Sequence, residues 1–314
     1  MNGETETETD LTFSWDGLAL AGTLHLPDAK GPHPAVLMMQ GSGVADRDSG
    51  GYFVPIRETI LGMGIATFSF DKPGCGASTG DWRHYALEGR AAQAMTAVEF
   101  LRSQPSVDEM RVGIWGQSQG GWLAQMLASR LPDLAFAIAN SGPSIDIAAQ
   151  NLYGCSHTLR AQGFDDDDIE QALVFMSDLH TAAFNAMSYE EVETTLLVEA
   201  RKQPWYGYVT IKDAEDWAEG CVFATDAYQP REAMARIECP FLAIYGGRDV
   251  LVPAWQGVEE SGIALDKAPT TDATVVVFPN GDHRIRDGST GNFVDGYLDL
   301  LGDWMAKRAF IENS

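Results

Sequence analysis

Short apolar segments alternate with longer segments of helical character along most of the chain, and this alternation constrains the fold most. The apolar segments are residues 35–39, 64–70, 111–115, 135–139, 241–245 and 273–278. The segments that favour helices lie near residues 53–62, 85–104, 119–130, 255–264 and 292–309. A continuous apolar run suits a strand that is covered on both faces. Because strands alternate with helices, the sequence predicts an α/β protein with a mostly parallel, doubly wound sheet.

Two regions depart from this alternation. Residues 11–27 alternate apolar and polar side chains around Asp16-Gly17, which predicts a β-hairpin with a tight turn. Between residues 144 and 235 there is no apolar strand run, and the sequence favours helices, with a capping box at Ser188-Tyr-Glu-Glu191. We therefore expect a helical cap after the sixth strand. The predicted division is a first core part (1–143), the cap (144–235) and a second core part (236–314).

The composition limits the classes of binding partner and the cellular compartment that we expect for the chain. The 314 residues carry 21 Lys and Arg against 45 Asp and Glu, a formal net charge of −24. Such an acidic surface repels phosphate, so we expect neither nucleic acid nor an anionic membrane as a partner. The first residues form no basic and apolar leader, and no apolar run approaches 18 residues, so the chain is expected to be cytoplasmic. A homodimer stays open.

The four cysteines show no paired spacing, so the sequence predicts neither a metal site nor a disulfide framework. We expect free, mostly buried thiols in a reducing compartment. The sequence leaves open whether Cys155 and Cys221 pair.

A candidate nucleophile lies in Gly116-Gln117-Ser118-Gln119-Gly120, which fits the pattern Gly-x-Ser-x-Gly. Ser118 directly follows a predicted strand and directly precedes a predicted helix, and glycines on both sides permit the tight turn that this junction needs. A second match surrounds Ser78, but it lies in a loop with no strand leading into it. The alternative role for Ser118 is that of a helix N-cap.

A serine hydroxyl needs a base to take its proton. Three histidines follow Ser118 in the chain, and of these His283 lies in a loop just after the last apolar strand run. His157 and His180 belong to the helical segment, where a lone histidine is usually a surface or partly packed residue. We therefore predict His283 as the general base.

An imidazole base needs an acid that fixes its tautomer. Asp249 lies four residues past the predicted strand 241–245, in a loop that can reach the loop after the next strand. Asp282 is adjacent to His283 in sequence, but an extended loop points it elsewhere. A turn or capping role is the alternative for Asp249.

Attack by Ser118 creates an oxyanion that needs preplaced donors. The backbone N–H of Gln119, at the start of the helix, is one candidate. The second is the backbone N–H of Ser42 in the glycine-rich loop after residue 39, with Gly41 and Gly43 as alternatives.

Together these motifs resemble the α/β-hydrolase superfamily, in its bacterial serine esterase and dienelactone-hydrolase-like branch. The residues that carry the resemblance are Gln40-Gly-Ser-Gly with Asp46-Arg-Asp48, Asp71-Lys-Pro-Gly-Cys-Gly76 with Ser78, Gly116–Gly121, Gly246–Asp249 with Val252-Pro253, and Gly281-Asp-His283. They span residues 11–143 and 236–310. The resemblance implies a cofactor-free serine hydrolase with a triad of Ser118, Asp249 and His283 and oxyanion donors at Ser42 and Gln119. It also implies that the inserted helices form a lid. Gln40 departs from the pattern, since many members carry histidine there.

The sequence thus predicts cleavage of a small-molecule carboxylic ester, bulky or cyclic, through an acyl-Ser118 intermediate. We expect Gln40 and the aromatic pair Trp205 and Tyr206 to line the substrate pocket. Arg47 forms an internal ion pair in one interpretation and binds a substrate carboxylate in the other. Two functions stay open beside the esterase: a peptidase or amidase of the prolyl-peptidase-like type, and a non-catalytic ligand receptor on the same fold.

Overall fold

The computed structural model describes residues 7–209, 211–224 and 227–310. Within them lies an eight-stranded sheet with the strand order β1-β2-β4-β3-β5-β6-β7-β8. The first two pairings in this order are antiparallel and the others are parallel. The strands are β1 (Thr7–Trp15), β2 (Leu18–Leu26), β3 (His33–Met39), β4 (Ala66–Phe70), β5 (Val107–Gln117), β6 (Ala137–Asn140), β7 (Phe241–Gly246) and β8 (Ala273–Phe278). The prediction of a mostly parallel sheet is confirmed.

The predicted hairpin is formed by β1 and β2. Trp15 pairs with Leu18, so the loop holds only Asp16 and Gly17, with φ of +48° and +76°. Two-residue loops with positive φ at both positions match the twist of the strands that they join.

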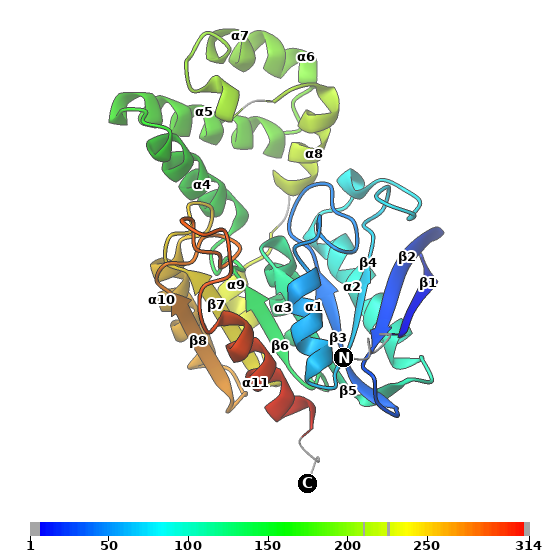
Figure 1. Ribbon diagram of the computed structural model, residues 1–314. Coiled ribbons are helices and arrows are strands. Elements are labelled where there is room, and N and C mark those ends of the chain that lie inside the picture. The colour runs from blue at the N-terminus through cyan, green and yellow to red at the C-terminus, as the bar shows by residue number, and fades with distance from the viewer. Residues whose placement is uncertain (1–6, 210, 225–226, 311–314) are drawn as a thin grey trace.

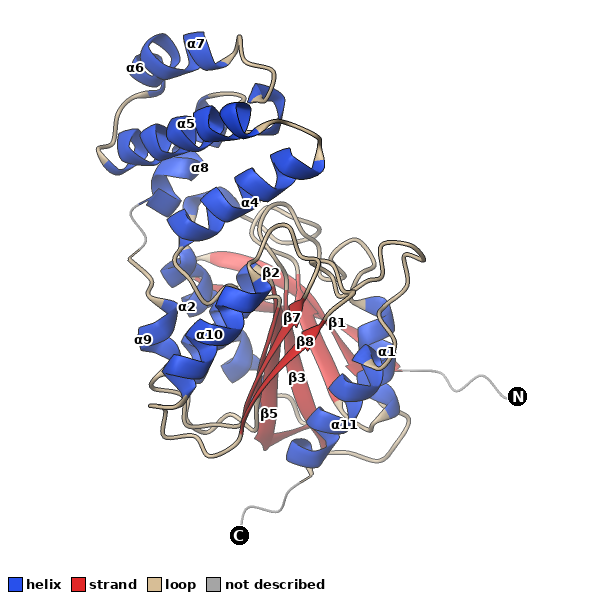
Figure 2. Cartoon of the chain, turned by 90° about the vertical axis from the view of Figure 1, so that its left-hand side faces the viewer, coloured by secondary structure: helices blue, strands red, loops and turns tan. Residues whose placement is uncertain are grey.

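Helices cover both faces of the sheet (Figures 1 and 2). On one face lie α1 (Val54–Gly62) and α11 (Tyr297–Ala309). On the other lie α2 (Leu87–Arg102), α3 (Gln119–Ala128), α9 (Pro230–Met234) and α10 (Ala254–Leu265).

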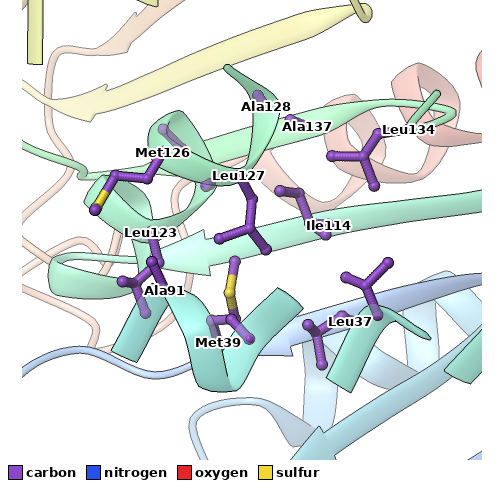
Figure 3. Close-up of a cluster of buried hydrophobic side chains, with 14 of the residues drawn as sticks. Leu37, Met39, Ala91, Ile114, Leu123, Met126, Leu127, Ala128, Leu134 and Ala137 are labelled. Carbon is purple, nitrogen blue, oxygen red and sulfur yellow. The ribbon is translucent and has the colours of Figure 1, made fainter. Parts of the chain in front are cut away.

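Strand β3 shows why both faces need cover. Its residues Ala35, Leu37 and Met39 join the core cluster under α2 and α3, while Val36 and Met38 join the cluster under α1 and α11. Figure 3 shows Leu37 and Met39 beside the side chains of α3. Successive side chains of a strand point to opposite faces, so a run that is apolar throughout is buried on both.

The segment between β6 and β7 is helical. Its elements are α4 (Ile147–Ala161), α5 (Asp166–Phe184), α6 (Tyr189–Val192), the π-helical turn η2 (Glu193–Leu197), α7 (Val198–Ala200), the 3₁₀ turn η3 (Tyr206–Tyr208) and α8 (Ala214–Ala224). We call these elements the helical insertion. They share a hydrophobic cluster of their own and stand beyond one end of the sheet (Figures 1 and 2). The side chain of Ser188 caps α6 in the predicted capping box.

The structure adds three details to the sequence predictions. Helix α9 lies inside the predicted cap range, but its Met234 packs in the core cluster beneath the sheet. Helix α11 begins at Tyr297 rather than near residue 292, because Gly296 adopts φ of +81° and residues 281–293 form two isolated β-bridges. The 3₁₀ turn η1 (Trp82–His84) precedes α2.

All four cysteines are free thiols, including Cys155 and Cys221, which both pack in the cluster of the helical insertion. Burial raises the pKa of Cys155 to about 11. Among the described helices, none combines the length and the apolar character that crossing a bilayer requires.

Candidate active site

Ser118 occupies a strained turn between β5 and α3. Its backbone has φ of +56° and ψ of −117°, a conformation that residues with a Cβ rarely adopt. Its N–H donates to the carbonyl of Asn140 on the neighbouring strand at 2.9 Å, and its own carbonyl accepts from Gly121 N–H at 2.7 Å. Both backbone contacts hold the strained residue in place, as is common at functional sites.

The two glycines of the motif are required by close backbone contacts. A Cβ on Gly116 would lie 1.9 Å from the carbonyl oxygen of Gly120, and a Cβ on Gly120 would lie 2.3 Å from the carbonyl oxygen of Met39. Any side chain at either position would force strand and helix apart. The glycine spacing therefore reflects how tightly the turn is folded.

His283 and Asp249 form a direct hydrogen bond. Nδ1 of His283 lies 2.7 Å from Oδ2 of Asp249. The other carboxylate oxygen, Oδ1, accepts from the backbone N–H groups of Leu251 and Val252 at 2.7 and 2.9 Å. The Asp249 side chain is 1% exposed and that of His283 is 17% exposed. The carboxylate is therefore fixed and buried, while the imidazole still reaches open space.

The two loops that carry this pair meet because β7 ends in two glycines. A Cβ on Gly246 would lie 2.2 Å from the carbonyl oxygen of Asp282, and one on Gly247 would lie 2.7 Å from that of Pro279. The side chain of Gln117 also reaches across, and its Nε2 donates to the carbonyl of His283 at 3.5 Å. The loop of His283 is thus held against both the loop of Asp249 and the turn of Ser118.

The alternative residues have other roles. The hydroxyl of Ser78 is buried between the carbonyl of Asp71 and the N–H of Ala21, at 2.8 and 2.9 Å. The carboxylate of Asp282 accepts from backbone N–H groups of its own loop. The ring of His157 stacks on Tyr153, with 3.8 Å between the ring centroids. None of these three residues lines the cavity that contains Ser118 and His283.

The loop after β3 passes close to Ser118. A Cβ on Gly41 would lie 3.2 Å from the Cβ of Ser118. Ser42 and Gln119 line the same cavity as Ser118. Within the described ranges, the backbone N–H groups of Ser42 and Gln119 donate to no protein group, so both are available to a ligand.

Gln40 supports this loop rather than the cavity wall. Its Nε2 donates to the carbonyls of Asp46 at 3.0 Å and Phe70 at 2.5 Å. It is 5% exposed and does not line the cavity of about 820 Å³ that contains Ser118. The structure thus differs from the expectation that Gln40 faces the substrate.

The cavity lies between the ends of the strands and the helical insertion. On the sheet side its wall includes Gly41, Ser42, Gln117, Ser118, Gln119 and His283. On the side of the insertion it includes Ile147, Gln150, His180, Asp216, Glu219 and Phe223. Burial raises the pKa of Glu219 above its ordinary value.

The sequence reasoning missed the wall that α8 supplies. Asp216, Glu219 and Phe223 follow one another at intervals of three and four residues, which places them on one face of a helix. That spacing is visible in the sequence, but it does not indicate which face looks into the cavity.

The expected aromatic pair lies elsewhere. Trp205 is 2% exposed, and its ring centroid lies 5.4 Å from that of Phe175 on α5. The hydroxyl of Tyr206 donates to the carbonyl of Ile211 at 3.0 Å. Neither residue lines the cavity of Ser118. Large aromatic surface is more stable in the insertion's core than in a water-filled cavity, which explains the difference.

Arg47 forms the internal ion pair. Its guanidinium contacts Asp71 at 2.8 Å and Asp10 at 2.7 Å. Although burial alone would raise the pKa of Asp71, the hydrogen bonds from Arg47 and from Ala77 N–H hold it below its ordinary value. The flanking residues Asp46 and Asp48 are not its ion-pair partners.

No group of three or more His, Cys, Asp or Glu side chains that could hold a metal ion occurs among the residues that the structure describes.

Known proteins share this architecture. The chain is 24% identical over 274 residues to the 2,6-dihydropseudooxynicotine hydrolase of Paenarthrobacter nicotinovorans; the match covers 85% of this chain but only 57% of that relative's length. The esterase Pf2001 of Pyrococcus furiosus superposes with a TM-score of 0.64 at 15% identity, over 98% of this chain and 94% of that one. Est1E of Butyrivibrio proteoclasticus, solved with ferulic acid bound, superposes with a TM-score of 0.58 at 16% identity, over 95% and 96% of the two chains.

These structural likenesses show the α/β-hydrolase fold that the motifs predicted. The sequence model of one hydrolase family, described as X-Pro dipeptidyl-peptidase (S15 family), matches residues 16–283 and thus spans every residue of the candidate site. The chain belongs to the X-Pro dipeptidyl-peptidase (S15) family and has the α/β-hydrolase fold.

Proposed function

We propose that this protein hydrolyses carboxylic esters through an acyl-Ser118 intermediate, with His283 as the general base and Asp249 as the residue that orients it. The observation that carries the proposal is the hydrogen bond of 2.7 Å between His283 and Asp249, formed in the wall of the cavity that also contains the strained Ser118. A nucleophile, a base and a fixed acid are the groups that acyl transfer to serine requires.

In the proposed reaction, Nε2 of His283 accepts the hydroxyl proton of Ser118 as Oγ attacks the ester carbonyl. The oxyanion of the tetrahedral intermediate accepts hydrogen bonds from the backbone N–H groups of Ser42 and Gln119. The C–O bond to the alcohol then breaks, and His283 returns its proton to the leaving oxygen. Water then attacks the acyl carbonyl while His283 accepts its proton. The bond from the acyl group to Oγ breaks, the acid leaves, and His283 gives the proton to Oγ of Ser118. Throughout, Asp249 accepts from Nδ1–H of His283 and stabilises the imidazolium.

The helical insertion is proposed to act as the lid that limits substrate size. It closes one side of a cavity of about 820 Å³, which has room for a bulky or cyclic small-molecule ester. A smaller side chain in place of Phe223 on α8 enlarges the cavity on the side of the insertion. The variant Phe223→Ala should therefore gain activity toward bulky aryl esters relative to p-nitrophenyl acetate, and an unchanged ratio would contradict the role of the insertion in size selection.

Labelling with a fluorophosphonate tests the nucleophile. The probe should attach to the wild-type protein and not to Ser118→Ala, with Ser78→Ala as the matched control that keeps its label. Retention of the label by Ser118→Ala, or absence of labelling in the wild type together with absence of ester turnover, would contradict the proposal and favour a ligand receptor.

A peptidase or amidase is the second candidate, and the specific observation that favours it is membership of a family described by X-Pro dipeptidyl-peptidase activity. The comparison of p-nitrophenyl esters with X-Pro p-nitroanilides separates the two. For substrates with the same acyl group, the esterase proposal predicts the following result. The ratio of kcat/KM for the ester to kcat/KM for the anilide should exceed the ratio of their uncatalysed hydrolysis rates. Efficient cleavage of X-Pro anilides with poor ester turnover would favour the peptidase.

A further inference from the structure

Two cationic side chains are buried directly behind the candidate oxyanion donors. Lys72, just after β4, is 7% exposed, and Arg90, on α2, is 5% exposed. Neither forms an ion pair with a carboxylate among the described residues. The carboxylate of Glu219 acts on both charges from beyond ion-pair distance. A buried charge is costly, so its hydrogen-bond partners indicate what it holds in place.

Within the described part of the chain, the hydrogen-bond partners of the Lys72 side chain both belong to the loop that carries Ser42. Its Nζ donates to the carbonyl of Gly43 at 2.8 Å and also to the carbonyl of Gly41. These two carbonyls flank Ser42 on either side. With both carbonyls turned toward Lys72, the loop has little freedom to rotate the peptide that contains the Ser42 N–H.

Arg90 holds the other candidate donor in a similar way. Its guanidinium donates to Oε1 of the Gln119 side chain, and its Nε donates to the carbonyl of Tyr85 at 2.8 Å. It also lies 5.3 Å from the ring centroid of Trp82 and 5.0 Å from that of Phe223. Gln119 is the first residue of α3 and lines the cavity, and the contact with Arg90 ties its side chain to α2.

Burial lowers the pKa of Lys72 to about 7, and it lowers that of Arg90 to about 10. For Lys72 this leaves the contacts intact, because the ammonium and the neutral amine both carry enough N–H donors for two carbonyls. The clamp on the loop therefore persists on either side of neutral pH.

We propose that Lys72 and Arg90 are positioning residues for the hydrolysis, each fixing one of the two backbone donors that stabilise the oxyanion. This inference rests on the proposed function. Donors aimed in advance at the developing charge lower the barrier because they need no reorganisation during the reaction. Neither side chain has to touch the substrate for this effect.

The test compares Lys72→Met and Arg90→Met with wild-type protein on a p-nitrophenyl ester. Removal of a whole oxyanion donor costs about 10²–10³ in rate, so loosening one should lower kcat by about 10- to 100-fold and leave KM within about twofold. The Ki of a trifluoromethyl ketone with the same acyl group, which forms a tetrahedral adduct on serine, should rise by the same factor as kcat/KM falls. Inhibition by the alcohol product should not change.

The controls remove one positive charge from residues that do not contact the candidate donors. Arg102→Met alters the same helix and breaks an ion pair with Asp133 and a hydrogen bond to the carbonyl of Asp133. Lys307→Met alters an exposed side chain of α11. Both should keep wild-type kinetics. Arg90→Lys, which retains the charge and some donor capacity, should fall between wild type and Arg90→Met.

Several outcomes would overturn the inference. One is that folded Lys72→Met and Arg90→Met retain wild-type kcat. Another is that KM and the inhibition constant of the alcohol rise as much as the Ki of the ketone, because a general loss of structure would have this result. Failure of wild-type protein to turn over any ester would overturn the proposed function, and this inference with it, and is recognised before any variant is made.

A measurement on wild-type protein covers the case in which the Met variants do not fold. Of the six lysines in the chain, only Lys72 is buried. In protein labelled with [¹⁵N]lysine, its Nζ protons should exchange slowly, and their resonance should shift when the ketone binds. Fast exchange at all six lysines, or no shift on binding, would contradict the clamp.

Discussion

The edge of the sheet and the helical insertion form opposite walls of one cavity, but they do so in different ways. At the sheet edge, backbone contacts leave almost no choice: a Cβ on Gly116 or Gly246 would lie 1.9 or 2.2 Å from a carbonyl oxygen. In the insertion, the wall consists of side chains on helix faces, such as Asp216 and Phe223 on α8. Under the proposed function, the sheet edge carries out the chemistry and the insertion selects the substrates that reach it.

The largest expected effect tests the sheet edge as a unit. Ser118→Ala and His283→Ala should each lower kcat by about 10⁶, as in serine hydrolases whose triad members act together. The double variant should be no slower than either single variant, because each single substitution already abolishes the function of the pair. Steady-state kinetics on a p-nitrophenyl ester measures all three. Additive losses in the double variant would show that the two residues act independently.

A smaller loss is expected when only the orienting acid changes. Asp249→Asn keeps the shape of the side chain but favours the wrong tautomer of His283, and the precedent for this change is a loss of about 10⁴ in kcat. Fluorophosphonate labelling should slow by a similar factor. Asp282→Asn is the matched control, since in the described structure its carboxylate accepts hydrogen bonds from backbone N–H groups of its own loop. Equal losses of kcat in the two variants would contradict the assignment of the orienting role to Asp249.

The sequence predicted the fold and the residues at the sheet edge because both depend on local rules. Apolar runs mark strands that are buried on both faces, and the glycines around Ser118 mark a turn whose backbone is crowded on both sides. Asp249 and His283 follow two neighbouring strands, so their loops must meet at the same edge.

The insertion resisted prediction because helix packing decides which face lies inward. Trp205 and Tyr206 stand beside glycine and proline in the sequence, a pattern that predicts a loop facing the substrate pocket, yet Trp205 is buried against Phe175. The prediction that Gln40 lines the substrate pocket differs from the structure for a related reason. Its side-chain amide donates hydrogen bonds to backbone carbonyls within the protein. Tertiary contacts that no local pattern encodes determine all three positions.

The next prediction separates the stability of the two regions. Trp205→Ala removes a buried side chain from the insertion's core and should cost about 3–5 kcal/mol of local stability. Hydrogen exchange should accelerate in α5 and α8 and stay unchanged in β5 and β7. Hydrolysis of p-nitrophenyl acetate should stay within about twofold of wild type wherever the insertion remains folded. Equal acceleration in the sheet would show that the two regions unfold as one.

The smallest expected effect is a dependence of stability on pH that originates at Lys72. Burial, and then the charge of Arg90, lowers its pKa to about 7, while Cys75 and Glu219 act in the opposite direction. In the unfolded chain the pKa of a lysine is about 10.4. Between these values the unfolded chain binds a proton that the folded protein does not bind, so the free energy of unfolding should rise with pH from about 7 upward.

Below pH 7 both states carry the proton, and this contribution should no longer change. Urea unfolding of wild type and Lys72→Met between pH 6 and about 9.5 checks the prediction. The difference in unfolding free energy should shift in favour of wild type as the pH rises. A difference that is constant across the range would mean that Lys72 stays charged in the folded protein.

Mass spectrometry of the protein during turnover tests the central claim most directly. When a slowly deacylated ester is mixed with wild-type protein and quenched in acid, the peptide that contains Ser118 should carry the mass of the acyl group. In Ser118→Ala protein, no peptide should carry the acyl group. An acyl group on a different residue, or steady ester turnover without any acylated peptide, would contradict the account.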